Sequence, residues 1–315
     1  MNQHEKPKVT IVVVPRESLN LFPTVIERIY DVTEFPFEMV VMESHSPASV
    51  RRYLKRCEAS RKNFRVLYSD RFLFPYEAVN QALPHLTTEF VVFIDNDVIV
   101  EKGWLSALVQ CAIEEKVGCV HPIYLVGKLE ERKIHVAEGR LIRRMRNGKP
   151  FVDSVMTYSG KRVDQIPDLR RKPSEFFEWH CVLFRKSLLD KVGALRPLTI
   201  SEHLDYVFRM KKVREKILLE PKALVAYDYE RVFKLRGADR NYFLFRWDPK
   251  KAEESLLDYC QKWGLHVDSM RARLGWGTAH WKRVNSTALH RRVLRKVKRL
   301  VGIPVKEEWL ETANV

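Results

Sequence analysis

The sequence predicts an α/β fold with a mostly parallel, doubly wound sheet and helices on both faces. Strand-like and helix-like segments alternate through the first 123 residues, which is the pattern of successive βαβ units. The strand-like segments are continuous apolar runs, typical of strands buried on both faces. With 315 residues and 45% hydrophobic side chains, the chain is long enough to bury a large core.

The elements of this first half follow one another at short intervals. The expected strands are Val9–Val14, Glu38–Met42, Phe64–Tyr68, Phe90–Ile94 and Val117–Ile123, and the expected helices are Leu21–Tyr30, Ala48–Cys57, Tyr76–Leu86 and Gly103–Glu115. Right-handed crossovers place the carboxyl ends of parallel strands at one edge, where such folds bind ligands. We therefore expect four segments to converge there: Pro15–Ser18, Glu43–Ser46, Ser69–Asp70 and Asp95–Asp97.

Two carboxylates follow the most apolar strand directly, in the segment Asp95-Asn96-Asp97. Ionised carboxylates at the end of a buried strand need a partner, because removing them from water is costly. Hard oxygen ligands at this edge suit a divalent cation that binds a phosphate ester. A surface turn is the alternative, since Asp and Asn are also turn residues. No glycine precedes Gly103, so a glycine-rich phosphate loop is absent and a metal would supply the positive charge.

The second half is less regular. Residues 124–174 predict an insertion or long loop region, with a hairpin at Asn147-Gly148. The expected elements after it are a strand at Glu175–Phe184, a helix at Lys186–Val192, a helix with Ser201 as N-cap, and two short strands at Ile217–Leu219 and Ala223–Tyr227.

Three titratable residues begin the helix after Ser201. Glu202 and Asp205 are three residues apart, so they share one face of its first turn. The helix dipole alone favours acids at this end, which is the structural explanation. The functional explanation is a general base that deprotonates a hydroxyl group. His203 could serve in the same way near neutral pH, although a lone histidine is more often structural.

These motifs together resemble the family-two glycosyltransferases of the GT-A fold, over roughly residues 9–247. The most specific match is the aspartate-x-aspartate (DxD) metal motif followed by Gly-Trp-Leu, which fits Asp95–Leu105. Four further segments match the family. The opening strand and its proline-led loop fit Val12–Ser18, and the strand with a uracil-contacting acid fits Met39–Ser46. The acceptor-side strand fits Val182–Gly193, and the acidic helix fits Glu202–Arg209.

The resemblance implies a glycosyltransferase with a nucleotide-diphospho-sugar donor, most often a UDP-sugar, and Mn²⁺ or Mg²⁺ on the diphosphate. By the match, Asp97 is the principal metal ligand and Asp95 lies near the ribose or the metal. The reaction is direct displacement at the anomeric carbon, usually with inversion, and the metal stabilises the leaving diphosphate. The residues implied for the nucleoside pocket are Pro15, Arg16, Glu17 and Glu43.

This chain departs from the family pattern at three positions. Glu43 stands where the family usually has aspartate. His203 takes the place of the usual catalytic aspartate, which leaves Glu202 or Asp205 as the base. Tyr227-Asp228 stands where many relatives have a metal-binding histidine, so Asp228 becomes the candidate third ligand.

An aromatic segment precedes the acidic helix and predicts the acceptor side. Aromatic faces stack on sugar rings, so Trp179 and His180 are candidate acceptor contacts. An aromatic core strand is the alternative, and it is the preferred explanation for Phe176 and Phe177. We interpret residues 1–123 as the nucleotide-sugar half, 124–247 as the acceptor-side half of the same domain, and 248–315 as a helical, basic C-terminal extension.

The net charge of +16 implies anionic partners. Residues 289–301 have the pattern of a basic amphipathic helix. We rank an anionic membrane surface first, a helix packed on the domain second, and nucleic acid third, since no nucleic-acid motif supports it. The five scattered cysteines favour reduced thiols, no structural zinc and a cytoplasmic protein. The polar N-terminus lacks the apolar segment of a signal peptide.

The leading hypothesis is a glycosyltransferase of glycan or cell-surface polysaccharide synthesis, cytoplasmic and peripheral at the inner membrane face, with a glycan or lipid-linked acceptor. A second hypothesis is an inactive protein that binds a nucleotide sugar or a carbohydrate, suggested by the departures at His203 and Tyr227. A third is a basic nucleic-acid-binding protein, suggested by the net charge.

Overall fold

The computed structural model describes residues 8–227, 235, 237–285, 293, 296–297 and 300–302. Ten strands within these residues form one sheet in the order β10-β12-β6-β11-β4-β1-β2-β3, with β5 beside β12 and β7 beside β6. Their bounds are β1 (Val9–Val14), β2 (Glu38–Met42), β3 (Phe64–Leu67), β4 (Phe90–Asp95), β5 (Val98–Val100), β6 (Cys119–Val126), β7 (Ile134–Val136), β10 (Lys172–Ser174), β11 (Cys181–Arg185) and β12 (Ile217–Tyr227).

The sheet is mixed, and its half from β4 to β3 is parallel, as the sequence predicts. Strands β4, β1, β2 and β3 are parallel neighbours, and β6 is parallel to β12. Strand β11 runs antiparallel to both β4 and β6. A long excursion precedes β11 instead of a single crossover helix, so the geometry of a βαβ unit does not constrain its direction.

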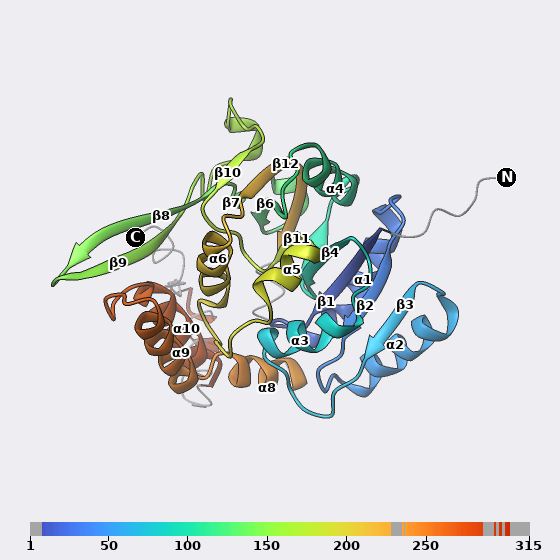
Figure 1. Cartoon of the computed structure of the whole chain (residues 1–315). Coiled ribbons are helices and arrows are strands. Elements are labelled where there is room, and N and C mark those ends of the chain that lie inside the picture. The colour runs from blue at the N-terminus through green and yellow to red at the C-terminus, as the bar shows by residue number, and fades with distance from the viewer. Residues whose placement is uncertain are drawn as a thin grey trace.

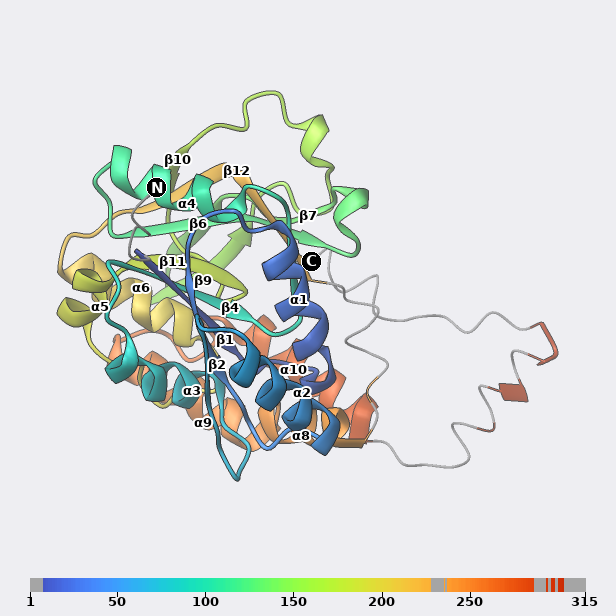
Figure 2. The same ribbon diagram turned by 90° about the vertical axis from the view of Figure 1, so that its right-hand side faces the viewer.

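Helices cover both faces of the sheet. Helices α3, α5 and α6 lie on one face, and α1 and α2 lie on the other (Figures 1 and 2). All of them start within a few residues of the predicted positions. The bounds are α1 (Phe22–Val32), α2 (Ala48–Ser60), α3 (Pro75–Ala82), α4 (Trp104–Glu114), α5 (Lys186–Val192) and α6 (Glu202–Lys212), with a 3₁₀ turn at Leu83–His85 after α3.

Three expectations need correction. The predicted strand Glu175–Phe184 begins only at Cys181, because the preceding backbone turns around the Tyr124 hydroxyl, which donates to Glu178 O at 2.8 Å and lies 2.9 Å from Cys181 O. Ser201 precedes α6, but its backbone is left-handed and its side chain makes no capping bond. The two predicted strands near residue 220 are one strand, β12, with an irregular register after Leu219.

The predicted hairpin is present and forms a separate sheet of β8 (Gly139–Arg146) and β9 (Lys149–Met156). Asn147 and Gly148 have φ values of 48° and 73°, which the tight two-residue turn requires. The hairpin projects from the main sheet toward the C-terminal helices (Figure 1). The hairpin is bound to the segment between the helices Pro249–Lys262 and Arg271–Asn285, since His266 N donates to Pro150 O at 2.7 Å.

Three helices follow the main sheet: α8 (Gly237–Arg246), α9 (Pro249–Lys262) and α10 (Arg271–Asn285). They gather below the sheet (Figure 2). The Tyr242 hydroxyl of α8 donates to Leu73 O at 2.9 Å and approaches Pro15 O at 3.2 Å. The Trp247 and Trp276 rings join α8 to α10 with centroids 5.1 Å apart. These helices therefore brace the loop that follows β1.

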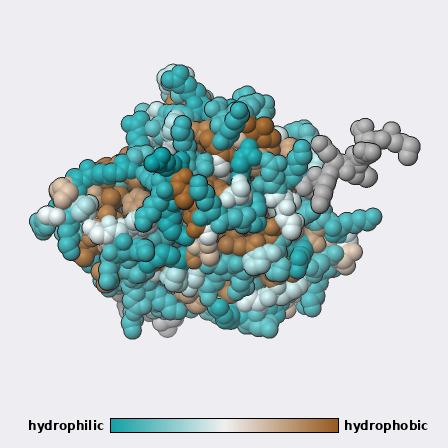
Figure 3. Space-filling view, in the orientation of Figure 1, coloured by the Kyte–Doolittle hydropathy of each residue, from teal (hydrophilic) through white to brown (hydrophobic). Residues whose placement is uncertain are grey.

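The surface is mainly hydrophilic on the face seen in Figure 3, where hydrophobic side chains show only in patches. None of the described helices combines the length and apolar character that crossing a bilayer requires. The five cysteines are buried, free thiols. Most of the predicted basic helix 289–301 lies outside the described residues, although Val293, Val297, Leu300 and Val301 are described and exposed.

The packing of α10 on α8 depends on a glycine. A Cβ atom on Gly277 would lie 2.7 Å from the Trp247 ring, whereas one on Gly275 would meet nothing within 4 Å. We expect Gly277→Ala to destabilise the protein by about 1–3 kcal/mol, as overpacking does. Gly275→Ala, on the same helix, is the control and should be neutral or stabilise by up to about 1 kcal/mol. Urea unfolding measures both, and equal effects would contradict the packing described.

Candidate functional site

The candidate site begins where β1 and β4 end side by side. Val14 and Asp95 are paired in the parallel register, so the loop after β1 lies against the DxD segment. Asn96 fastens the two together. Its side-chain oxygen accepts from Arg16 N at 2.7 Å, and its side-chain nitrogen donates to Ser18 O at 2.6 Å. Sequence reasoning did not single out Asn96, because its partners lie 80 residues away.

Four buried carboxylates meet around the guanidinium group of Arg16, which is itself buried. Arg16 Nε lies 3.5 Å from both Glu17 Oε1 and Asp95 Oδ2. Arg16 Nη1 lies 3.8 Å from Glu202 Oε1. The charge of Asp97 also acts on Arg16. The structure thus brings together five of the predicted site residues from three separate segments.

A second buried arginine, Arg246 of α8, enters the same cluster. Its Nη2 atom lies 3.6 Å from Glu202 Oε1, its Nη1 donates to the carbonyl oxygen of Thr199, and its guanidinium lies over the Trp247 ring. Sequence reasoning did not single out Arg246, although the resemblance implies a donor-side closing segment at residues 239–247 and offers Arg240 as its diphosphate contact. A signal was present, because Arg246 shares the spacing of the buried residues Tyr242 and Phe243 on α8.

Several polar atoms of the cluster have no hydrogen-bond partner within the described part of the chain. They are Asp97 Oδ1, Glu17 Oε2, Glu202 Oε2, Arg246 Nε, and Arg16 Nε and Nη1. Each such buried atom costs about 1–3 kcal/mol when it stays unsatisfied. Native proteins contain few of them, and a group gathered at one place indicates a site for ions, water or a ligand.

The pKa values of the two DxD carboxyls reflect this environment. Burial raises the pKa of Asp95 to about 7, although Arg16 opposes the shift. Burial, reinforced by the charges of Asp95 and Glu17, raises the pKa of Asp97 well above its usual range. Neighbouring carboxylates that disfavour each other's ionisation in this way are stabilised by an added cation.

The residues present fit a divalent metal ion. When all are ionised, the four carboxylates and two arginines leave two negative charges. Asp95 and Asp97 supply the hard oxygen atoms that Mn²⁺ or Mg²⁺ prefers. No cluster of three or more His, Cys, Asp or Glu side chains in the described residues could hold a metal by itself. Asp228, the predicted third ligand, lies outside the described residues.

The two candidate bases on α6 face different surroundings. Glu202 points into the carboxylate cluster, where Arg246 and Arg16 outweigh the effect of burial and lower its pKa. Asp205 is buried elsewhere and accepts hydrogen bonds from Arg196 at 3.0 Å, Arg209 at 3.1 Å and the Trp263 indole at 2.9 Å. The structure therefore brings Glu202, and not Asp205, together with Asp95.

His203 lies on a further side of α6 and faces a buried ion pair. Its Nε2 atom lies 3.4 Å from Arg273 Nη1 of α10 and 4.0 Å from Glu178 Oε1. Burial lowers the pKa of His203 to about 4, with Glu178 opposing the shift. The ring is therefore neutral at pH 7. Because an arginine can only donate, Nε2 is the acceptor in this contact with Arg273. The lone pair that a general base would use is therefore already engaged.

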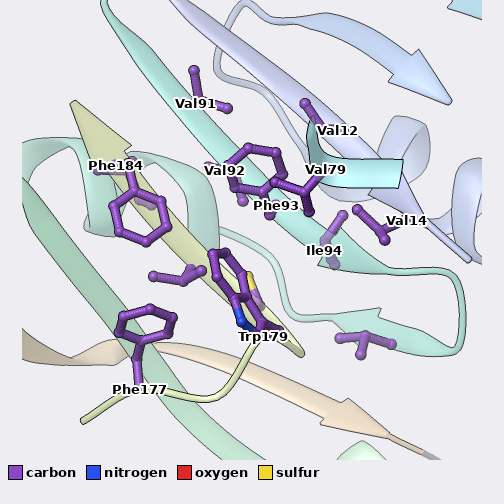
Figure 4. Packing of buried hydrophobic residues seen from close by; sticks show 14 of the residues in the cluster. Val12, Val14, Val79, Val91, Val92, Phe93, Ile94, Phe177, Trp179 and Phe184 are labelled. Carbon is purple, nitrogen blue, oxygen red and sulfur yellow. The ribbon is translucent and has the colours of Figure 1, made fainter. Parts of the chain in front are cut away.

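The two predicted acceptor-side residues differ in their surroundings. His180 Nδ1 lies 2.9 Å from Asp95 Oδ2, and its ring stacks on Tyr227 with centroids 4.7 Å apart. Trp179 is buried and packs edge-on against Phe93 and Phe177 (Figure 4). Phe177 and Phe176 are fully buried, as the core explanation requires. Contact of Trp179 or His180 with an acceptor stays a prediction.

Glu43 lies at the end of β2, on the other side of β1 from Asp95. Arg51 donates to its Oε2 atom from Nη2 at 2.9 Å, and Ser46 N donates to Oε1. Glu43 is therefore at the expected edge of the sheet but outside the carboxylate cluster. Its predicted contact with the nucleobase is untested by this arrangement.

Comparisons with known proteins agree with this geometry. The family model described as Glycosyl transferase family 2 matches residues 10–193, more than half of the chain. The chain belongs to glycosyl transferase family 2. A pre-mycofactocin glycosyltransferase of Mycobacterium tuberculosis is 26% identical over 167 residues, which are 52% of this chain and 32% of that protein. The chain thus spans about a third of the length of this curated relative.

Two solved structures show the same fold. GalNAc-T7 with UDP, GalNAc and Mn²⁺ has a TM-score of 0.54 at 11% identity, over 79% of this chain and 51% of that one. Mannosyltransferase PcManGT of Pyrobaculum calidifontis with GDP-Man and Mn²⁺ has a TM-score of 0.54 at 14% identity, over 99% and 85%. The predicted GT-A fold of this family-2 protein is confirmed.

The ion pair of the partly exposed Arg273 with the buried Glu178 provides a test of the C-terminal packing. Arg273→Met leaves the Glu178 carboxylate buried without its cation, so we expect a loss of about 3 kcal/mol in the free energy of unfolding. Arg271→Met, two residues earlier, removes only exposed contacts of 3.8–3.9 Å and should cost at most about 0.5 kcal/mol.

Urea unfolding of both variants gives the comparison. Adding Glu178→Gln to Arg273→Met removes the uncompensated charge and should restore part of the loss. If the losses in the free energy of unfolding of the two single variants, Arg273→Met and Glu178→Gln, simply added up in the double variant, the pair would not be coupled.

Proposed function

We propose that this protein is a metal-dependent glycosyltransferase that moves a sugar from a nucleoside-diphosphate donor to an acceptor hydroxyl group. The observation that carries the proposal is the cluster of four buried carboxylates and two buried arginines at the carboxyl edge of a family-2 fold, in which several polar atoms make no hydrogen bond within the described residues. A bound ion, water or ligand is the usual explanation for such a group of atoms.

The metal ion would be held by Asp97 and Asp95. When bound, Mn²⁺ or Mg²⁺ neutralises the charge that develops on the leaving diphosphate. The two solved relatives contain Mn²⁺ together with UDP in one case and GDP-Man in the other. Our proposal keeps a UDP-sugar as the expected donor, on the family resemblance, and treats a GDP-sugar as the alternative.

The residues of the chain have separate tasks in this proposal. Arg16 and Arg246 offer buried guanidinium groups to the diphosphate, whose oxygens can replace Glu17 and Glu202 as partners. Pro15, Glu17 and Glu43 line the nucleoside side. Glu202 takes the proton of the acceptor hydroxyl, because its Oε2 atom is buried, ionised and without a partner. Displacement at the anomeric carbon from the side opposite the diphosphate gives inversion.

The acceptor is the least constrained part of the proposal. Trp179 and His180 remain the proposed acceptor-side residues, and the acceptor is a glycan or a lipid-linked sugar of cell-surface polysaccharide synthesis. A cytoplasmic protein held at the inner membrane face by the basic segment 289–301 fits the sequence pattern. Nucleic acid is not a proposed partner, because no sequence motif for it is present.

The donor site is tested by substituting the principal metal ligand. We expect wild-type protein to bind UDP or GDP more tightly with Mn²⁺ than without it, and Asp97→Asn to lose this dependence by about tenfold or more, as the loss of even supporting residues does at metal sites. Asp70→Asn is the control, since this fully exposed carboxylate lies at the same sheet edge.

Isothermal titration calorimetry gives both affinities. Thermal unfolding supports it, because a ligand at a hundred times its Kd stabilises the native state by roughly 2.7 kcal/mol. Absence of binding by both nucleotides, with and without Mn²⁺, would contradict the proposed function.

The catalytic base is tested by exchanging Glu202 and Asp205 separately. We expect Glu202→Gln to bind the nucleotide and to lower sugar transfer, or hydrolysis of the donor by water, by about 10²–10⁴-fold. Asp205→Asn should mainly lower stability, because it weakens the bonds to Arg196 and Arg209. Released nucleoside diphosphate measures turnover. A wild-type protein that binds nucleotide sugars without any turnover would instead be the inactive binding protein of the second hypothesis.

A further inference from the structure

A narrow pocket opens beside the carboxylate cluster, with room for about one water molecule or methyl group. Asp95 and Glu202 stand at it, and its remaining wall includes apolar atoms of Val79, Phe93, Trp179 and Leu195. The surface that these residues expose in the pocket is almost entirely apolar. The pocket therefore adjoins both the proposed metal ligand and the proposed base.

The wall of the pocket has a strong chemical preference. A hydroxyl group placed against Val79, Phe93 and Leu195 would leave water and gain no hydrogen bond from them, which costs about 1–3 kcal/mol in proteins. A methyl group in the same place loses nothing and removes apolar surface from water.

The position of the pocket connects it to the donor. In the proposed function, the anomeric carbon lies between the diphosphate, which Asp95 and Asp97 hold through the metal, and the acceptor oxygen, which Glu202 deprotonates. A pocket that both Asp95 and Glu202 border is therefore within reach of the sugar ring. Figure 4 shows Val79, Phe93 and Trp179 among the buried side chains near β4, so this wall is part of the hydrophobic core.

We propose that this pocket receives a methyl group of the transferred sugar, so that the donor is a 6-deoxyhexose or an N-acetylhexosamine nucleotide in preference to a simple hexose one. The inference rests on the proposed function and adds the class of donor sugar. The shared chemistry is the methyl substituent, at C6 in one class and on the acetamido group in the other.

The test compares donors that differ at the position that would carry the methyl group: a 6-deoxyhexose has CH3 where its parent hexose has CH2OH, and an N-acetylhexosamine has an acetamido group where the hexose has a hydroxyl group. Calorimetry with Mn²⁺ measures the Kd of UDP, UDP-glucose, UDP-6-deoxyglucose and UDP-N-acetylglucosamine, and the GDP series of mannose and 6-deoxymannose is used if GDP is the nucleotide that binds. We expect one methyl-bearing sugar to bind about tenfold or more tightly than its parent hexose, the usual effect of one methyl-sized group in an apolar pocket. The sugar that shows the preference identifies the class.

Two substitutions of Val79 locate the effect in this pocket. Val79→Ile fills the space with one added methyl group. Val79→Thr keeps the shape of the side chain but replaces one methyl group by a hydroxyl group. Both should reduce the preference for the methyl-bearing sugar about tenfold while the affinity for UDP or GDP alone stays unchanged, which also shows that the site is folded. Val155→Ile, at an exposed position of the hairpin, is the matched control and should keep the preference.

The outcomes separate the two proposals. Nucleotide sugars that bind with equal affinity whether or not they carry the methyl group would overturn the pocket assignment and leave the glycosyltransferase proposal standing. A preference that survives both Val79 substitutions would overturn the pocket assignment as well. Failure of every nucleotide and nucleotide sugar to bind would overturn the proposed function itself, and the inference with it.

Discussion

The site depends on one buried cation, the guanidinium group of Arg16 among the carboxylates of Glu17, Asp95 and Glu202. Each of these charges is costly to remove from water. Two of the carboxylates have a further partner, since His180 Nδ1 lies 2.9 Å from Asp95 Oδ2 and the Trp247 indole donates to Glu17 Oε1 at 2.9 Å. Several hydrogen bonds from other elements hold the loop after β1, which carries Arg16 and Glu17, in place. Asn96 binds its backbone, and helix α8 holds it through Tyr242, through Asp239 to Ser18, and through Trp247 to Glu17.

Helices beyond the region matched by the family model complete the site. The match ends at residue 193, yet Arg246 and Trp247 contact Glu202 and Glu17, and Arg273 contacts Glu178 and His203. The predicted boundary at residue 247 falls between helices that pack on each other, since the Trp247 and Trp276 rings join α8 to α10. Helix α10 also contacts the candidate site through Arg273.

The sequence was sufficient where one local pattern has one structural solution. Buried parallel strands have few other solutions, so β1 to β4 were placed almost to the residue, and Asp95 and Asp97 lie at the sheet edge where β4 ends, as expected. The sequence was insufficient where tertiary contacts decide. Residues 175–180 were expected to be extended but wrap around Tyr124, and the spacing of Glu202 and Asp205 does not reveal that Asp205 is already bound by Arg196, Arg209 and Trp263. Asn96 and Arg246 were missed because their partners are remote in sequence.

The charge balance also explains why a metal and a donor should bind together. The cluster carries two negative charges in excess when ionised, and a nucleoside diphosphate adds more, so the donor alone meets repulsion that the two arginines only partly offset. In the proposed function a divalent cation would have just two protein ligands among the described residues, Asp95 and Asp97, fewer than it normally coordinates. The donor would supply oxygen ligands to the cation, and the cation would offset the charge of the donor. By thermodynamic linkage, the factor by which the cation strengthens donor binding would then equal the factor by which the donor strengthens cation binding.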